Sequence, residues 1–289
     1  MHDEIVSRLA STLDAELIEA EARRAERSLH PDAMELVFQG RSCWNRGMTS
    51  EYMAKARIYF ERASILDPSS IEALVGMASV DAASATVVMV LDRDARLAAA
   101  EAMLIKALSV SPQHARAHMF LGAVQMATNR AVLGMRECER ALALDQNLAE
   151  AHCLIGLAKL FVGRGAETEA HILEALRLSP RDIGAFRWMQ YLGSTKLMLG
   201  ADADAVVWLR RSLEANRNYP IAHFQLAAAL ALLGSLEEAR AAVRAGLALD
   251  PTFTIHRMQG YSVLCADPTF RAGRNRVREG MRMAGVPEG

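Results

Sequence analysis

Apolar residues recur along this chain with the spacing of amphipathic helices. Near the N-terminus, Ile5, Leu9, Leu13 and Leu17 stand four residues apart with charged residues between them, which places them on one stripe of a helix. Ala and Leu dominate the composition, and clusters of β-branched residues are scarce. The pattern predicts an all-α protein.

The helical pattern repeats, because six segments end in a similar way. They are FERASILDP (60–68), LIKALSVSP (104–112), CERALALDQ (138–146), ILEALRLSP (172–180), LRRSLEANR (209–217) and VRAGLALDP (243–251). The small residues in their fourth positions are 44, 34, 34, 37 and 34 residues apart. The chain therefore consists of 34-residue units with insertions of ten and three residues.

Small residues form two further rows within these units. One row is Ala56, Ala100, Gly134, Thr168, Ala205 and Ala239, and the other is Gly40, Ala78, Gly122, Gly156, Gly193 and Ala227. We expect two helices of each unit to approach closely at these rows, with Phe60, Leu104, Ile172, Leu209 and Val243 filling the remaining holes. Pro68, Pro112, Pro180 and Pro251 would end the second helix of a unit.

This order of small residues, a bulky residue and a proline resembles the tetratricopeptide repeat (TPR) family over residues 33–252. Gln146 and Arg217 replace the proline of that pattern, and Cys138 replaces the bulky residue. The resemblance implies a right-handed α-solenoid of about six helix-turn-helix units with capping helices. We predict an N-terminal amphipathic helix (1–30, cap or linker), a TPR solenoid (31–253) and a basic C-terminal capping helix (254–289).

The ten-residue insertion predicts a lengthened helix pair at 71–111, with one helix over 71–91 and its partner over 94–111. Its tip carries Val88, Met89, Val90 and Leu91. These apolar residues either contact another subunit or attached domain, which would make the chain self-associate, or are buried between the two long helices.

In TPR solenoids the first helix of each unit lines a concave face that binds a protein or peptide. In the second to sixth units, the positions three before, one after and four after the close-approach residue carry no Lys, Asn or Arg, which argues against the carboxylate clamp of co-chaperone members. We expect an apolar groove for a helix or peptide, unless a terminal helix of the chain fills it. The candidate residues are Met119, Met126, Cys153, Leu157, Leu160, Tyr191 and Phe224.

Three histidines, His118, His152 and His223, occupy the same slot of their units and raise the alternative of a metal-dependent enzyme using His and Cys. Equivalent positions in successive repeats lie about 10 Å apart, whereas zinc ligands must all lie about 2 Å from the ion. No HExxH, GxxxxGKS/T, GxSxG or GxGxxG motif is present. We predict no metal, no cofactor and no catalytic residue.

Charge and targeting signals change this picture little. The net charge is −1, and the four cysteines show no CxxC pair. The basic run Arg271, Arg274, Arg276, Arg278 and Arg282 suggests nucleic-acid or membrane binding as an alternative, but Phe270 is its single aromatic neighbour in the sequence, and we expect the run to form a solvated helix row. The apolar run at 83–91 is too short to span a membrane and no signal peptide is evident, so we expect a cytoplasmic protein.

A narrower resemblance concerns the order of segments. DEIVSRLASTL, FERASILDPSSIEALVGMA and DPTFTIHRMQGYSVLCADPTFRAGRNRVREGMRMAGVPEG are similar to the C-terminal TPR region of multidomain bacterial adenylate/guanylate cyclases. The resemblance implies a regulatory module of a signalling protein whose catalytic domain lies elsewhere. The sequence thus predicts a non-catalytic protein-interaction scaffold.

Overall fold

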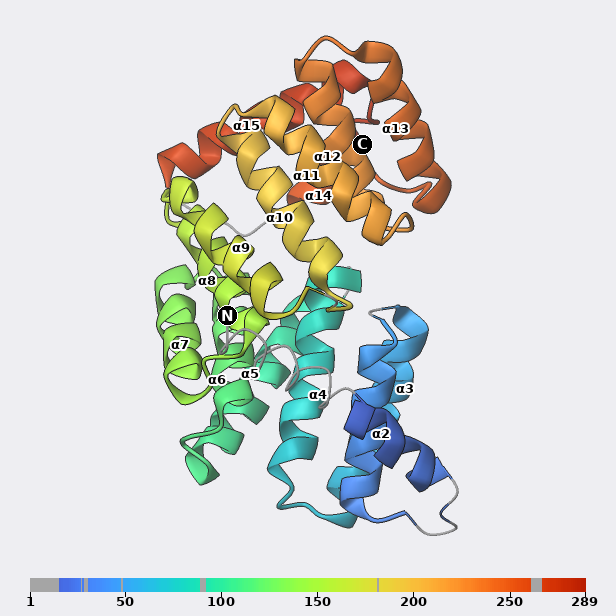
Figure 1. Ribbon diagram of the computed structural model, residues 1–289, viewed down its shortest axis with the longest axis vertical. Coiled ribbons are helices and arrows are strands. Elements are labelled where there is room, and N and C mark those ends of the chain that lie inside the picture. Colours follow the sequence, from blue (N-terminus) through green and yellow to red (C-terminus); the bar gives the residue numbers. More distant parts are fainter. Residues whose placement is uncertain are drawn as a thin grey trace. The chain divides into compact units, whose positions relative to one another are not determined.

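The computed structural model describes residues 16–26, 28, 31–47, 49–88, 92–180, 182–260 and 267–289 (Figure 1). All regular structure in these ranges is helical. Contacts between residues divide the chain into two units. Unit 1 is Met1–Leu154 with Arg177–Ser179, and unit 2 is Ile155–Leu176 with Pro180–Gly289.

Unit 1 contains a helical segment at 16–26 followed by three antiparallel helix pairs, α2 with α3, α4 with α5 and α6 with α7. The bounds are α2 Ala33–Asn45, α3 Ser50–Leu66, α4 Ile71–Ala83, α5 Arg93–Val110, α6 Ala115–Ala127 and α7 Ala131–Leu144. The Asp32 side chain caps α2 by accepting from the Glu35 N–H (2.8 Å), and Glu35 accepts from the Asp32 N–H (2.9 Å).

Unit 2 continues the alternation of first and second helices. Its elements are α8 Ala149–Phe161, of which 155–161 belong to this unit, a 3-10 turn Gly165–Glu167, α9 Thr168–Leu178, α10 Ala185–Met198, α11 Asp202–Ala215, α12 Pro220–Leu232, α13 Leu236–Leu249, α14 Ile255–Gly260 and α15 Pro268–Ala284. The predicted all-α architecture of repeated helix pairs is confirmed.

The two helices of a pair approach each other closely at glycines that the sequence pattern identified. A Cβ atom added to Gly134 of α7 would lie 2.5 Å from the carbonyl oxygen of Gly122 in α6, and one added to Gly122 would lie 2.6 Å from the carbonyl oxygen of Gly134. The Phe60 ring of α3 fills the space left by Gly40 of α2 and Gly76 of α4. Close approach at these rows is therefore confirmed.

The helix expected over 71–91 differs from the prediction. It is α-helical only to Ala83 and continues as a π-helical turn over Ser84–Val88. A π turn takes up an extra residue without ending the helix, and here the Thr86 hydroxyl donates to the Ala82 carbonyl (2.7 Å). Of the predicted tip, Val88 closes this turn, whereas Met89, Val90 and Leu91 lie outside the described residues.

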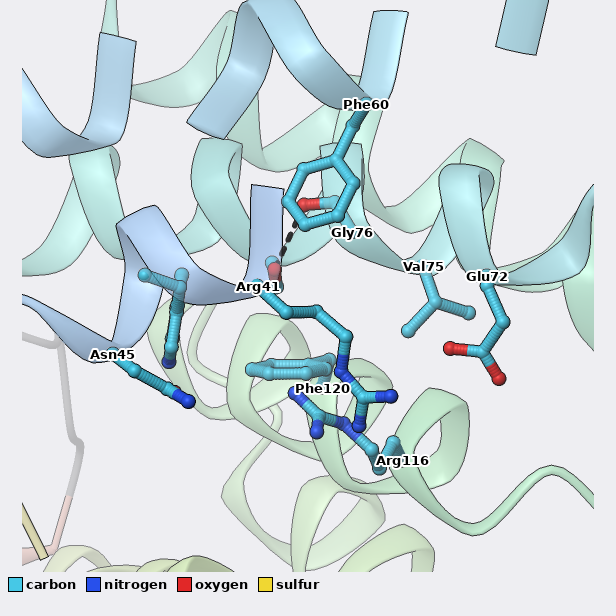
Figure 2. Close-up of a pocket in the computed structure, with 10 residues that line it drawn as sticks. Arg41, Asn45, Phe60, Glu72, Val75, Gly76, Arg116 and Phe120 are labelled. Carbon is cyan, nitrogen blue, oxygen red and sulfur yellow. Dashed lines mark hydrogen bonds between the residues drawn. The ribbon is translucent and has the colours of Figure 1, made fainter. Parts of the chain in front are cut away.

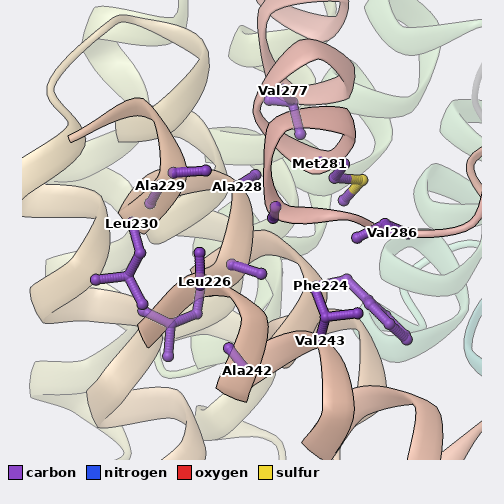
Figure 3. Close-up of a cluster of buried hydrophobic side chains, with 14 of the residues drawn as sticks. Phe224, Leu226, Ala228, Ala229, Leu230, Ala242, Val243, Val277, Met281 and Val286 are labelled. Atoms are coloured by element: carbon purple, nitrogen blue, oxygen red, sulfur yellow. The ribbon is translucent and has the colours of Figure 1, made fainter. Parts of the chain in front are cut away.

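The core of unit 2 surrounds Phe224 of α12 (Figure 3). The Phe224 ring stacks on Phe253, with centroids 3.7 Å apart and an interplanar angle of 9°. Val277 and Met281 of α15 and the following Val286 belong to the same buried cluster. The predicted C-terminal helix is thus part of the core of unit 2.

Candidate protein-binding faces

In unit 2, α15 lies across the face formed by the first helices of the pairs. Its N-terminal Phe270 meets Phe161 of α8 edge to face at 5.5 Å. Further along, a Cβ atom on Gly273 would lie 2.9 Å from the Met198 Cβ of α10, and α15 also packs against α12. We call the surface that α8 (155–161), α10 and α12 present to α15 the first-helix face of unit 2.

An arginine and the C-terminal tail hold α15 in this position. Arg276 donates through Nη1 and Nη2 to the two Asp202 oxygens (2.6 and 2.5 Å) and through Nη1 to the Leu197 carbonyl (2.9 Å). The hydrogen bond to Asp202 raises the pKa of the Arg276 guanidinium. After α15, the Ile255 N–H donates to the Pro287 carbonyl (2.9 Å), so the tail also pairs with α14.

Most of the predicted groove residues are packed inside the chain. Five of them are at most 6% exposed, namely Met119 (4%), Met126 (2%), Cys153 (0%), Leu160 (6%) and Phe224 (0%). Met126 packs within its own helix pair, because its Cγ lies 2.7 Å from where a Gly134 Cβ would be. Only Leu157 and Tyr191 keep partial exposure.

Unit 1 has a hollow on its own first-helix face, between α2, α4 and α6 (Figure 2). The space within it, open solvent included, is about 360 Å³. The lining residues are Arg41, Trp44 and Asn45 of α2, Phe60 of α3, Glu72, Val75, Gly76 and Ser79 of α4, and Arg116 and Phe120 of α6.

The hollow corrects the prediction that the groove carries no Lys, Asn or Arg. The prediction rested on the second to sixth units. In the first unit the same offsets of one and four residues after Gly40 give Arg41 and Trp44, and Asn45 follows. The signal was therefore present in the sequence, whereas Arg116 stands outside those offsets and needed the structure.

Charged and aromatic groups share this hollow. Figure 2 shows that Arg41 and Arg116 line the same hollow, with Glu72 at the side. Trp44 and Phe120 pack edge to face with ring centroids 5.9 Å apart, and the Arg116 Cζ lies 5.8 Å from the Phe120 centroid. The hollow thus combines positive charge with aromatic surface.

Glu72 remains ionised at neutral pH. His114 Nδ1 accepts from the Ala117 N–H (3.1 Å), which leaves Nε2 to donate to Glu72 Oε1 (3.0 Å). This hydrogen bond is the largest effect that lowers the pKa of Glu72, burial opposes it, and the charges of Arg41 and Arg116 lower it further. The hollow therefore contains one negative and two positive side chains.

The repeated histidine slot serves the local fold. His118 Nε2 lies 2.9 Å from the Pro112 carbonyl, and His223 Nε2 lies 2.9 Å from the Arg217 carbonyl. In both repeats the imidazole ring on the first helix contacts a backbone carbonyl of the preceding loop, six residues earlier in the chain. His118 also contacts Glu137 of α7 through Nδ1 (2.6 Å). Among the described residues, no three His, Cys, Asp or Glu side chains are grouped so that they could hold a metal ion.

Part of the basic run on α15 is engaged within the chain. Arg276 pairs with Asp202, and Arg282 pairs with Glu279 (3.4 Å) and Glu288 (2.9 Å). Within the described ranges, no helix has the length and apolarity needed to cross a membrane.

The fold is similar to that of several solved structures. A chain of the APC/C hetero-tetramer Cut9–Hcn1 matches 91% of this chain with a TM-score of 0.67 at 18% identity. TTC0263, a TPR protein of Thermus thermophilus, matches 68% of this chain and 98% of its own length (TM-score 0.54, 18% identity). The structure of pilF of Pseudomonas aeruginosa matches 79% of this chain and 96% of its own length (TM-score 0.53, 15% identity).

These likenesses show the fold, so the chain has the α-solenoid architecture of TPR proteins. It spans about half, 48%, of the Cut9–Hcn1 chain that it matches. No family model matches the sequence, and no curated protein does.

Proposed function

We propose that the chain is a non-catalytic protein-interaction scaffold that binds a segment of a partner protein on the first-helix face of unit 1. One observation carries the proposal. In unit 2 the chain's own α15 covers the first-helix face, whereas in unit 1 the hollow between α2, α4 and α6 presents half-buried aromatic and charged side chains. Half-buried aromatic and arginine side chains are typical anchors of protein interfaces.

The structural likenesses support the same class of function. The Cut9–Hcn1 structure is a hetero-tetramer by its own description, so a protein with this fold assembles with another. Repeat solenoids bind partners over extended surfaces built from successive units. We therefore assign the partner as a protein or peptide, and extend the predicted apolar groove to the mixed polar and aromatic hollow.

A peptide-display experiment tests the proposed face. We expect a random peptide library to yield binders of the wild-type chain that the Asn45→Trp variant no longer retains, because the indole would fill the hollow. Arg62→Trp, which adds the same bulk at an exposed position of α3, is the matched control and should retain them. Binders that tolerate Asn45→Trp and are lost with Arg62→Trp would contradict the proposed face.

We further propose that the chain associates with itself through the predicted tip, as suits the regulatory module of a larger signalling protein similar to a cyclase. The support is the sequence resemblance and the apolar run Val88, Met89, Val90 and Leu91. Light scattering after size-exclusion chromatography should show a dimer that Val88→Glu with Val90→Glu converts to a monomer. A monomeric wild-type chain, or a dimer unchanged by the two substitutions, would contradict self-association through the tip.

A further inference from the structure

We propose that Arg96 positions the predicted tip for contact with a second copy of the chain, because it joins Asp81 and Asp92 across the base of the ten-residue insertion. The inference rests on the proposed self-association and names the residues that control it. We call Arg96, Asp81 and Asp92 the insertion clasp. All three residues belong to unit 1.

The structure locates the insertion between α4 and Leu97 of α5. In all six repeats the α-helix that comes first ends five residues after its close-approach residue, and the pairs are Gly40 and Asn45, Ala78 and Ala83, Gly122 and Ala127, Gly156 and Phe161, Gly193 and Met198, and Ala227 and Leu232. The second helices α7, α11 and α13 begin three residues before the small residue of their row, whereas α5 begins at Arg93, seven residues before Ala100. The ten additional residues therefore lie within 84–96, a stretch that begins with the π turn and ends in the first turn of α5.

The insertion clasp joins the two ends of this stretch. Arg96 donates through Nη1 to Asp81 Oδ1 (3.3 Å) and through Nε to Asp92 Oδ1 (2.9 Å). Asp81 lies on α4 before the insertion, and Asp92 directly precedes α5. A guanidinium presents its donors in a rigid plane, so its bonds to the two carboxylates fix the direction in which the chain leaves α4 and enters α5.

Asp81 anchors the clasp to the rest of unit 1. Its side chain is 6% exposed, and it also accepts from Nη1 of Arg57 on α3, which donates to the Met77 carbonyl as well (3.3 Å). At the other end of the insertion, Arg93 Nη2 donates to the Ala127 carbonyl of α6 (2.7 Å). The base of the insertion is thus held by α3, α4 and α6.

These charges serve orientation more than stability. A buried ion pair contributes little net free energy compared with apolar side chains of similar size, because both charges lose their hydration. Three residues after the close-approach residue, the second repeat has a carboxylate, and the other five repeats have Cys43, Gln125, Lys159, Lys196 and Leu230. The carboxylate therefore coincides with the insertion, as expected of a residue that positions it.

Substitutions in the clasp test this inference against a matched control. Asp92→Asn removes the acceptor at the exposed end of the clasp, and Arg96→Gln removes both hydrogen bonds. Asp94→Asn is the control, because Asp94 also lies in the first turn of α5, but its side chain is 94% exposed and pairs with Arg93 instead (3.0 Å). Asp92→Glu retains a carboxylate and serves as the conservative variant.

We expect Arg96→Gln to raise the dissociation constant of the dimer at least about ten-fold, and Asp92→Asn to raise it by a smaller factor. Light scattering over a range of protein concentrations measures this constant. Amide hydrogen exchange of Ser84–Val88 should become faster in the same order, while exchange in α6 stays unchanged and shows that the variants are folded. Asp94→Asn and Asp92→Glu should match the wild type in both measurements.

Two results would overturn the clasp. One is a dimer whose dissociation constant is the same in Arg96→Gln as in the wild type. The other is an equal effect of Asp92→Asn and Asp94→Asn, which would assign the effect to the charge at the start of α5. If Arg96→Gln also makes exchange in α6 faster, Asp92→Asn decides in its place, because the Asp92 side chain is 55% exposed and its replacement leaves the core intact.

The same measurements separate this inference from the proposed self-association. If Val88→Glu with Val90→Glu abolishes a dimer that Arg96→Gln leaves unchanged, the tip associates and only the clasp is wrong. If the wild-type chain is monomeric, self-association is wrong and the inference falls with it.

Discussion

Removal of residues 268–289 is expected to unfold unit 2 while unit 1 keeps its helices. The truncation takes away Phe270, Val277, Met281 and Val286, each at most 6% exposed. Burial of one such side chain contributes about 1.5–3 kcal/mol, so the loss is on the order of 6–12 kcal/mol, comparable to the whole stability of a typical domain. Hydrogen exchange should show lost protection in α10 and α12 and retained protection in α4 and α6.

A pair of substitutions on α15 provides the control for this truncation. Met281 is fully buried and Met283, two residues later, is 45% exposed. Met281→Ala should lower the stability of unit 2 by about 3 kcal/mol, whereas Met283→Ala should change it by about 0.5 kcal/mol or less. If truncated protein still protects the amides of α10 and α12, α15 is not required for the core of unit 2.

The Gly134→Ala substitution is expected to lower the free energy of unfolding of unit 1 by about 3 kcal/mol. The added methyl group would lie 2.5 Å from the Gly122 carbonyl oxygen, and backbone cannot yield as a flexible side chain can. Relief requires α6 and α7 to move apart, which opens the packing around Cys138. Urea unfolding followed by circular dichroism measures the effect.

Gly165→Ala is the matched control for this substitution. Its added methyl group would meet the Leu160 Cδ1 at 3.1 Å, the end of a flexible side chain that can adjust. Gly165 belongs to unit 2, and we expect the free energy of unfolding of that unit to fall by about 1 kcal/mol or less. Equal effects of Gly134→Ala and Gly165→Ala would show that backbone contact between α6 and α7 is not what limits the space at Gly134.

The repeat architecture was predictable because the same contact recurs in each unit and leaves a small residue at the same place. The rows of small residues in the sequence include Gly122 and Gly134, and these two glycines are where α6 and α7 cross. The π turn after Ala83 was not predictable, since the sequence shows only that ten residues are inserted and not how a helix absorbs them.

The candidate sites were harder to predict, because the sequence pattern indicates which positions of a helix belong to one face but not which other helix packs against that face. The sequence predicted a basic capping helix at the C-terminal end, but nothing local stated that Val277 and Met281 are buried or which helices cover them. Met126 stands at a predicted groove position of its repeat. Its side chain nevertheless packs within its own helix pair, because Gly134 leaves room there. Arg41 was accessible to the same offset argument, whereas the presence of Arg116 in the same hollow required the structure.

The placement of α15 has a consequence for the order in which the chain folds during synthesis. Contacts in unit 1 join nearby helices, such as Arg130 with Glu101, 29 residues apart, so this unit can pack as it leaves the ribosome. Arg276 instead reaches the Leu197 carbonyl, 79 residues back. The first-helix face of unit 2 therefore stays uncovered until α15 has emerged, and during this interval its apolar side chains are exposed to aggregation and to chaperones.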